Sequence, residues 1–498
     1  MKLLTFRPIL STLLCSFILL LCTGLTFGAP TLNDVAQDVT PLTLSELQDQ
    51  AGNLAINVLQ SRQQLTAANL ELSAFEASLK PRLDLVANMP NYYRTSREVV
   101  LDDGTIGFRE IELNNSFVGL AASQQIATTN TSVTLESRLQ RTDNLVTDDK
   151  SYQGSPIRLF VRQPLLAFNP LKWDRELLPL RRQVAERELT AARATARLEA
   201  TNLFFDLVTA DQERRIAELN QTANEQLYAV AEERFALGKI NRGDLVQLRL
   251  ELTSARQDLL RASRLVTSAS AAIDRLLGKA EGSGNYSPVL PTTNQPTDID
   301  ATAARNYLQR NRPELLAAFV AEREAARQTD RTRRELGPRI DIEAGYGFIR
   351  NDAELAPIYN DPNDERILSV NLSLPILDWG ERRDRVKAAQ SNRELAREVA
   401  RRTGVNLNSE LEELLTTWTT VQEELALAEE IVALANERFE MSRASYELGA
   451  IPLTELSLAQ QYRDRNTRAF AQTLRAYWLT YARLARLTLH DFINNRPL

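Results

Sequence analysis

The stretch RFALGKINRGDLV occupies residues 234–246, and the stretch SYELGAIPLTELS occupies residues 445–457. In both, a Leu-Gly pair closes a long helical pattern, an isoleucine follows two residues after the glycine, and an acid opens the next helical pattern. Glycine suits the left-handed backbone at a helix end, and Pro452 suits the first turn of a new helix. Each stretch therefore predicts a tight turn between two antiparallel helices.

The two turns belong to a longer duplication. They lie 211 residues apart, and the same offset aligns RQPLLAF (162–168) with SLPILDW (373–379). Farther upstream, LKPRLDL (79–85) matches LGPRIDI (336–342) at an offset of 257, so the first half carries 46 additional residues between its two prolines. Because the landmarks keep their order, the chain is predicted to hold two copies of one unit.

These landmarks and the composition set the expected domain boundaries. We expect a leader at 1–29, a first repeat at 30–278, a linker at 279–300 that is rich in Gly, Pro, Ser and Asn, and a second repeat at 301–498. The expected strands and helical hairpins fall at about 82–165 and about 175–278 in the first repeat, and at about 339–377 and about 382–490 in the second.

The first 29 residues have the layout of a secretory signal peptide. Lys2 and Arg7 precede an uncharged apolar run, and the small residues Gly28 and Ala29 follow it. Two alternatives are a transmembrane anchor and a lipoprotein signal with Cys22 as acceptor, although Leu21 is bulky for that cleavage site. Both cysteines of the chain lie in this segment, so the mature protein would have none, which suits an oxidising compartment.

The charge and the scarcity of reactive side chains exclude several functions. Removal of Lys2 and Arg7 changes the formal net charge from −6 to −8, and an acidic protein is a poor partner for nucleic acid. His490 is the only histidine, and we expect it at the surface or at a helix end. Without mature cysteine or a second histidine, the usual zinc sites and nucleophile–base pairs are missing, so no catalytic residue, metal site or cofactor is predicted. The remaining enzymatic alternative is a secreted enzyme that acts through carboxylates.

Several segments alternate between apolar and polar residues with the period of a β-strand. RIDIEAGYGF (339–348) and LSVNLSLPI (368–376) do so in the second half, and SFVGLAASQQIA (116–127) and TSVTLESRL (131–139) do so in the insertion. Such strands fit a half-buried soluble sheet or a sheet with one face in lipid. We expect four to six strands, which is too few to close a barrel of about eight or more, so a lipid-facing sheet would require several chains.

Two segments are too long for ordinary globular helices. From about Glu176 to Leu237 the only proline is Pro179, which we place in the first turn, and roughly 60 helical residues would span about 90 Å. In the second half, one apolar stripe has coiled-coil spacing and a second stripe lies beside it, so that this helix is predicted to pack on two sides. The first stripe comprises Val421, Leu425, Ala428, Val432, Ala435 and Phe439, and the second comprises Leu427, Ile431 and Leu434.

The ordered combination of signal peptide, duplicated halves, alternating strands and paired hairpins resembles the outer membrane efflux protein family of the TolC type. Its most specific pieces are QPLLAFNPLKWDR (163–175), SLPILDWGERRDR (373–385) and the paired turns. The resemblance implies a mainly α fold with a membrane β-barrel portion. Strands would be shared in a trimeric barrel across the outer membrane, and long antiparallel hairpins would form an α-barrel in the periplasm.

The same resemblance implies a function and its partners. The protein would be a homotrimeric passive conduit of a tripartite efflux or type I secretion system, in contact with outer-membrane lipid. An inner-membrane transporter and a periplasmic adaptor protein would dock at the helical tips. The tip residues are then Leu237, Gly238, Lys239 and Ile240 in the first half and Leu448, Gly449, Ala450 and Ile451 in the second.

The resemblance also points to residues of an aperture. Tyr446 and Gly449 match a Tyr-x-x-Gly pattern, Glu455 takes the place of the first gate acid, and Asp244 is its equivalent in the first half. The sequence departs from the family at Leu458, where a second acid can occur, and at Ile451, where a basic residue can occur. An alternative role for both acids is stabilisation of a helix N-terminus.

A periplasmic coiled-coil adaptor or scaffold without a pore is the competing interpretation. It would explain export and long helices. It explains the alternating strands and the two-fold repeat poorly.

Overall fold

The computed structural model describes residues 40–100, 104–280, 282, 284–291, 298–448 and 450–498. The predicted signal peptide and both cysteines lie outside the described residues. Among the residues described, no helix combines the length and the apolar character that a membrane span requires.

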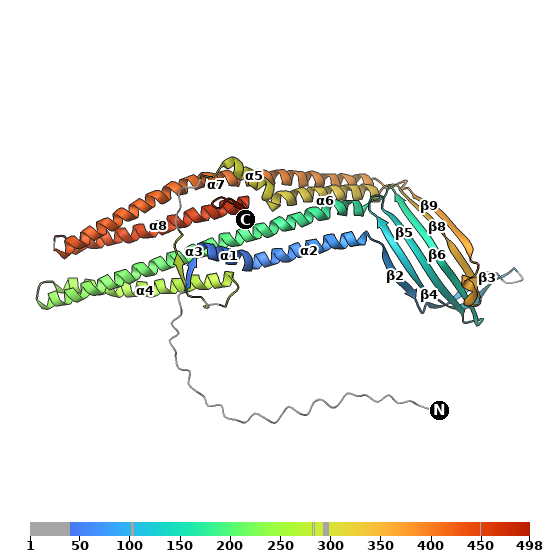
Figure 1. The fold of residues 1–498 in the computed structure, drawn as a ribbon, viewed down its shortest axis with the longest axis horizontal. Coiled ribbons are helices and arrows are strands. Elements are labelled where there is room, and N and C mark those ends of the chain that lie inside the picture. The colour runs from blue at the N-terminus through green and yellow to red at the C-terminus, as the bar shows by residue number, and fades with distance from the viewer. Residues whose placement is uncertain (1–39, 101–103, 281, 283, 292–297, 449) are drawn as a thin grey trace, which may run out of the picture. The chain divides into compact units, whose positions relative to one another are not determined.

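The described chain consists of helices and strands in a mixed order (Figure 1). The helices are α1 (Leu44–Leu54), α2 (Ile56–Ser78), α3 (Pro170–Ala236), α4 (Arg242–Leu276), α5 (Ala301–Asn311), α6 (Pro313–Glu335), α7 (Glu381–Glu447) and α8 (Leu453–Thr488), with the short 3-10 helix η1 (Ala356–Tyr359). The strands are β1 (Thr40–Thr43), β2 (Arg82–Asn88), β3 (Tyr92–Val100), β4 (Ile106–Ile126), β5 (Thr131–Asn144), β6 (Asp149–Leu165), β7 (Tyr286–Val289), β8 (Arg339–Asp352), β9 (Asn363–Ser373), β10 (His490–Asp491) and β11 (Arg496–Pro497).

The long helices form two antiparallel hairpins, α3–α4 and α7–α8. Helices α3 and α7 have 67 residues each, which corresponds to about 100 Å of helix. Helix α2 packs along α3, α6 packs along α7, and α3 also contacts α6 and α8. The hairpins are therefore joined side by side within one chain.

The start of α3 corrects one expectation. The helix begins at Pro170 because Asn169 caps it, its side-chain oxygen accepting from the backbone N–H of Lys172 at 3.1 Å. Pro179 consequently lies inside the helix rather than in its first turn.

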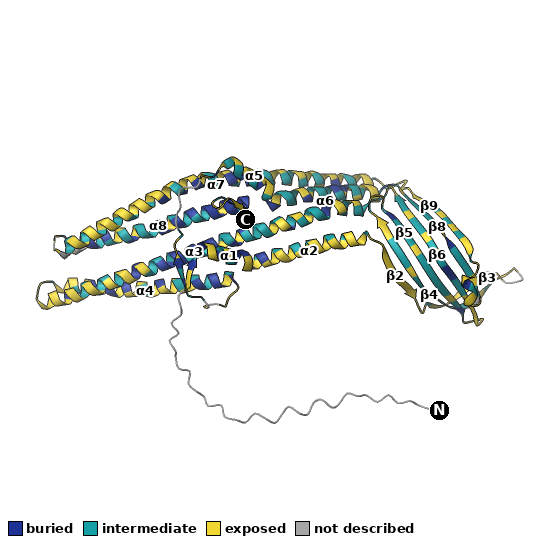
Figure 2. Cartoon of the chain, viewed as in Figure 1, coloured by how far each residue is buried: buried dark blue, intermediate teal, exposed yellow. Residues whose placement is uncertain are grey.

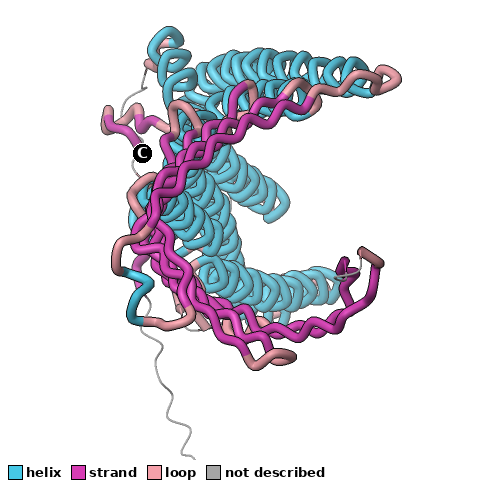
Figure 3. The backbone as a smooth tube through the Cα atoms, turned by 90° about the vertical axis from the view of Figure 1, so that its right-hand side faces the viewer, coloured by secondary structure: helices cyan, strands magenta, loops and turns pink. Residues whose placement is uncertain are grey.

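The large sheet has the order β2-β4-β5-β6-β8-β9, with β3 paired to β4 as well, and all pairs are antiparallel. Leu113 and Asn114 pair with both β3 and β5, so β3 lies on the same edge of β4 as β2. The seven strands thus fill six positions, and the expectation of four to six strands was too low by one. Figure 3 shows the sheet curving across the long helices.

The two faces of this sheet differ in chemistry. Leu135 of β5 is paired with Leu159 of β6, which is paired with Tyr346 of β8, so these three side chains lie on one face of the sheet. Apolar side chains of β2, β4 and β9 lie on the same face. Its exposed members include Leu83, Leu85, Leu120, Leu368, Val370 and Leu372. On the opposite face, Arg158 lies 3.3 Å from Glu136 and 2.9 Å from Glu365. The sheet therefore has one apolar and one ion-paired face.

The core lies midway along the hairpins, where β1, α1, α5 and β7 pack against the long helices. Figure 2 shows buried residues gathered there and exposed residues toward the hairpin ends. Trp418 of α7 is 2% exposed and packs against Tyr477 and Tyr481 of α8, while Phe204 and Phe205 of α3 are fully buried. Removing so large a side chain would cost about 3–5 kcal/mol, so this belt fixes the arrangement of the helices.

The segment 279–300, predicted as a linker, contains regular structure. Its strand β7 pairs in parallel with β1, from Thr40 opposite Tyr286 to Thr43 opposite Val289. The Tyr286 hydroxyl donates to Asp274 of α4 at 2.8 Å, and burial, together with this carboxylate, raises the pKa of Tyr286 to about 12. The segment is thereby attached to the core.

The C-terminus corrects the expectation for His490 in part. The residue follows the end of α8, as expected, but it is only 5% exposed and stacks on Tyr307 of α5 with ring centroids 3.9 Å apart. Next to it, Asp491 accepts from the Tyr481 hydroxyl at 2.5 Å and from the side-chain amide of Asn494 at 2.7 Å. These contacts hold the small β10–β11 hairpin against α5 and α8.

The attachment of this hairpin is expected to depend on pH through Asp491. Burial by itself would raise the pKa of Asp491, but hydrogen bonds from Asn494 and Tyr481 outweigh it and place this pKa below its usual value of 3.8. Because the pKa of Asp491 is lower in the folded chain than in the unfolded chain, its ionised carboxylate stabilises the folded state at neutral pH. This stabilisation is lost as the pH falls from 3.8 through the lowered pKa of the folded chain.

We therefore expect protease cleavage after Phe492 to accelerate below pH 4 in the parent, measured with an acid-active protease. Asp491→Asn removes the charge, so its cleavage rate should vary less across the same pH range. An equal pH dependence in both proteins would contradict the assignment.

Candidate functional site

The first hairpin end is a helix stop followed by a helix start. Gly238 has φ of +71°, and its left-handed backbone lets Lys239 N donate to Arg234 O at 2.8 Å. Asn241 then caps α4, because its side-chain oxygen accepts from the backbone N–H of Asp244 at 2.9 Å. The turn predicted from the Leu-Gly pair is confirmed here.

The second hairpin end repeats this geometry at the 211-residue offset. Ala450 N donates to Ser445 O at 2.9 Å, which is the equivalent of the Lys239–Arg234 bond. Pro452 takes the place of Asn241 and precedes the first residue of α8, so this end has no side-chain cap. Gly449 lies outside the described residues.

The ends carry exposed apolar side chains and acids. Leu237 is 69% exposed and Leu448 is 86% exposed, while Ile240, Tyr446 and Ile451 are half-buried. The acids predicted for the aperture, Asp244 and Glu455, lie in the first turns of α4 and α8 and are exposed. Within the described chain, no ion pair or hydrogen bond joins the two hairpin ends, which Figure 1 draws as separate. The structure thus brings the predicted residues together at each end but does not join the two ends.

Farther from the ends, a polar ladder joins α3 to α8. We define it by three rungs: Asp206 with Arg475 at 2.6 Å, Glu213 with Arg468 at 2.7 Å, and Asn220 with Asp464 at 2.9 Å. The acids and the amide of α3 are spaced by seven residues, as required for one face of a helix in a coiled coil. Sequence analysis missed the ladder, although this heptad spacing could have revealed it.

The last rung is the most buried. Asp464 is 5% exposed, accepts from Asn220 and receives two hydrogen bonds from Arg463, while Gln460 donates to the Asn220 oxygen at 2.6 Å. Exposed ion pairs contribute about 0–1 kcal/mol, whereas loss of a buried acceptor costs about 1–3 kcal/mol. This rung therefore dominates the polar connection between the hairpins.

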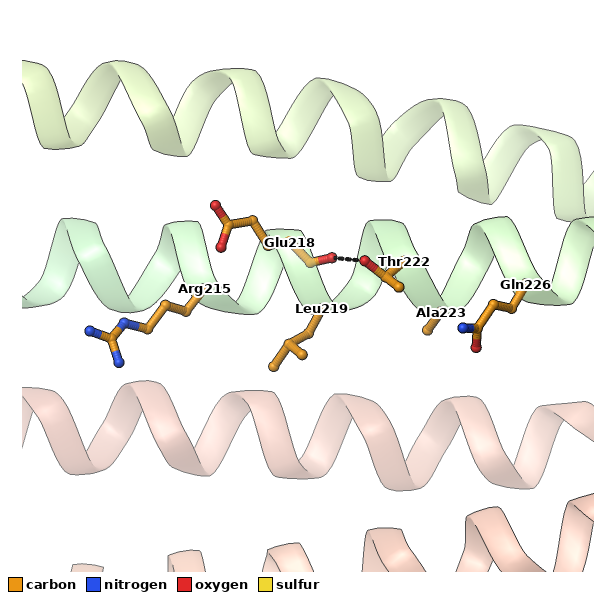
Figure 4. A pocket seen from close by; sticks show the side chains of 6 residues that line it. All are labelled: Arg215, Glu218, Leu219, Thr222, Ala223 and Gln226. Carbon is orange, nitrogen blue, oxygen red and sulfur yellow. Dashed lines mark hydrogen bonds between the residues drawn. The ribbon is translucent and has the colours of Figure 1, made fainter. Parts of the chain in front are cut away.

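Beside it lies a shallow groove on the surface of α3. Figure 4 shows that its lining comes from α3 alone. Leu219 in this lining is 60% exposed. The lining residues are Arg215, Glu218, Leu219, Thr222, Ala223 and Gln226. The described residues hold no cluster of metal-ligating side chains.

Comparison with known proteins gives a consistent result. The family model for outer membrane efflux proteins matches residues 110–279 and 305–488, once in each half. No curated protein sequence matches the chain significantly.

Solved structures share the fold at low sequence identity. The Campylobacter jejuni CmeC outer membrane channel is 15% identical with a TM-score of 0.65, covering 89% of this chain and 85% of its own. The Neisseria gonorrhoeae MtrE outer membrane channel in its open state is 14% identical with a TM-score of 0.60, covering 89% and 88%. A membrane protein from Pseudomonas aeruginosa is 19% identical with a TM-score of 0.66, covering 90% and 91%.

The ladder generates a prediction about the spacing of the hairpin ends. Asp464→Ala leaves the Asn220 amide without its acceptor, so the ends should separate more widely. Spin labels at K239C and A450C, in assemblies diluted with unlabelled chains, should report a longer and broader distance distribution by pulsed electron resonance. Glu423→Ala is the matched control, because Glu423 is exposed on α7 and, in the described part of the chain, forms no ion pair. Identical distributions in Asp464→Ala and the parent would contradict this role.

Proposed function

This chain belongs to the outer membrane efflux protein family, and on that premise we propose that three copies form one conduit that docks a periplasmic adaptor and an inner-membrane transporter. Membership makes the protein an outer-membrane efflux channel whose helices extend into the periplasm. The family is a family of conduits rather than of enzymes. The competing interpretation as a poreless adaptor finds no support in the family match.

The open sheet is the single observation that supports the three-copy assembly most directly. Among the residues that the structure describes, no strand pairs with the outer edge of β2 and β3 or with the outer edge of β9. Leu368 of β9 is 78% exposed. Unpaired edges and apolar faces are unfavourable unless covered. Copies that pair β9 of one chain with β2 of the next would satisfy both edges.

The helices support the same assembly. The first α7 stripe is used inside the chain, since Val421 and Leu425 are buried. The second stripe, Leu427, Ile431 and Leu434, remains 49–60% exposed. A neighbouring copy packed on this stripe would close the helical wall.

The hairpin ends are the proposed docking site. It comprises Leu237, Gly238, Lys239, Ile240, Leu448, Gly449, Ala450 and Ile451. The exposed leucines offer apolar contact, and the two ends repeat the same turn, so each chain would present two similar contacts to the adaptor. We also propose that the repeats extend over 30–278 and 301–498, with the signal peptide removed at 29.

A test of docking uses one charged substitution at each of two exposed leucines. Leu448→Asp should abolish export in a strain that lacks the native gene, because a carboxylate would be buried without a partner at the adaptor contact. Leu260→Asp on α4, where Leu260 is 74% exposed, should retain export. Both variants should stay in the outer-membrane fraction after salt and alkaline washing. Release of the parent protein by these washes would instead support the adaptor interpretation, and normal export by Leu448→Asp would exclude the tips as the docking site.

We expect the acids at the proposed aperture to make the channel selective for cations. Three-fold symmetry would bring three Glu455 carboxylates together near the periplasmic end, with Asp244 and Tyr446 beside the same ends. Like charges in a narrow opening favour cations. In planar bilayers, Glu455→Ala should lower the cation-to-anion permeability ratio, while Glu423→Ala should not change it. Equal ratios for Glu455→Ala and the parent would remove Glu455 from the aperture.

A further inference from the structure

We propose that the inserted hairpin β4–β5 is part of the membrane wall, so that the assembly encloses an eighteen-position barrel that admits bulky hydrophilic cargo. This inference rests on the three-copy assembly proposed above. It assigns a structural and selective role to the 46 additional residues of the first half.

The two halves contribute unequally to the sheet. Between Pro338 and Pro375 the second half supplies β8 and β9. Between Pro81 and Pro164 the first half supplies β2 with β3, β4, β5 and β6, which occupy four positions. Two equal halves would give four positions per chain, and the insertion raises the number to six.

The inserted hairpin lies inside the sheet rather than on its border. Strand β4 pairs with β2 and β3 on one edge and with β5 on the other, and β5 pairs with β6 over nearly its whole length. A hairpin that projected from the sheet would leave β2 and β6 in contact. The register instead separates them by two strands.

The apolar face continues without interruption through the inserted strands. Leu120 of β4 pairs with Leu85 of β2, and Leu135 of β5 pairs with Leu159 of β6. Leu120 and Leu135 are 50% and 42% exposed, and their partners outside the insertion, Leu85 and Leu159, are 71% and 42% exposed. The inserted strands therefore present the same side to lipid as β8 and β9.

An even number of positions allows closure. Successive strands alternate in direction across all six positions, so β2 and β9 run in opposite directions. When β9 of one copy meets β2 of the next, the new pair is antiparallel like the others. Three copies then give eighteen positions, and the pattern remains antiparallel around the ring.

The bore follows from this number. With strands about 4.8 Å apart and tilted by about 40°, eighteen strands place opposite backbones about 36 Å apart, whereas twelve give about 24 Å. Arg158 is engaged with Glu136 and Glu365 along the wall. The β8–β9 loop is also fastened to the sheet, because Ile358 is fully buried over Gly154. The barrel thus leaves room for bulky hydrophilic solutes, and size selection falls to the hairpin ends.

The test measures which side chains of β4 face lipid. Since both cysteines lie in the leader, single-cysteine variants need no background substitution. Spin labels are attached to four single-cysteine variants of the full chain, reconstituted in bilayers: Leu120→Cys, Ala121→Cys, Ala122→Cys and Ser123→Cys. Labels at 120 and 122 should be accessible to oxygen dissolved in lipid, and labels at 121 and 123 should be accessible to a water-soluble nickel chelate. Leu368→Cys, Ser369→Cys, Val370→Cys and Asn371→Cys on β9 provide the matched control. Nickel accessibility at all four β4 positions, with alternation on β9, would overturn the proposal.

A second measurement separates this inference from the proposed function. Electron cryo-microscopy of the purified assembly should resolve three copies and eighteen strand positions in the wall. Three copies with twelve positions would overturn the wide barrel and leave the conduit intact. A copy number other than three would overturn the assembly on which the total rests.

Discussion

The constraint behind this architecture is the pair of free edges of one curved sheet, formed by β2 with β3 and by β9. The inner strands pair with a neighbour on both sides over most of their length, whereas in the described part of the chain β2, β3 and β9 pair on one side only. In lipid, each unsatisfied group would cost several kcal/mol, so the edges require partners of matched length and direction. Identical copies, as proposed above, would supply such partners by symmetry. The long hairpins follow the same rule, since each chain leaves one apolar stripe of α7 uncovered.

Duplication explains why this solution uses two hairpins per chain and where the halves are free to differ. The turns at Gly238 and Ala450 are built by equivalent backbone hydrogen bonds, because both must reverse a helix at the same level. The caps differ, with Asn241 in one half and Pro452 in the other, since either residue starts a helix. The strands tolerate a larger change. A two-stranded hairpin inserted between two antiparallel strands leaves the directions of those two strands unchanged. The first half can therefore widen the sheet by two strands while all strand pairs stay antiparallel.

Periodicity made much of this architecture predictable. The alternation in 339–348 predicted β8. The helical pattern from Arg382 to Leu448, interrupted only by Gly404, predicted α7 to within one residue of its start and end. Packing was less accessible. His490 lacks any local signal for burial, because the ring it stacks on, Tyr307, lies 183 residues earlier in the chain. The start of α3 was expected at about residue 175 because the helical pattern was used as the boundary. The helix begins five residues earlier, at Pro170, because Asn169 caps it. The strand number was underestimated because β3 is mostly polar and extends only part of an edge. The roles of the residues at the hairpin ends came from family resemblance, and they remain proposals.

The distribution of burial determines which part of the channel is free to move. Aromatic packing around Trp418 fixes the middle of the hairpins, whereas residues 426–455 contain no buried side chain in the described part of the chain. Segments with few buried contacts open at low free energy. Between the two regions, the buried rung at Asp464 is the last polar connection of the ladder before α3 and α8 reach their turns. A partner that binds the exposed leucines at the ends would therefore contact the part of each hairpin that has the fewest buried side chains. Within the chain, such a movement would act against the polar connection at Asp464, while the sheet and the aromatic packing around Trp418 would keep their structure.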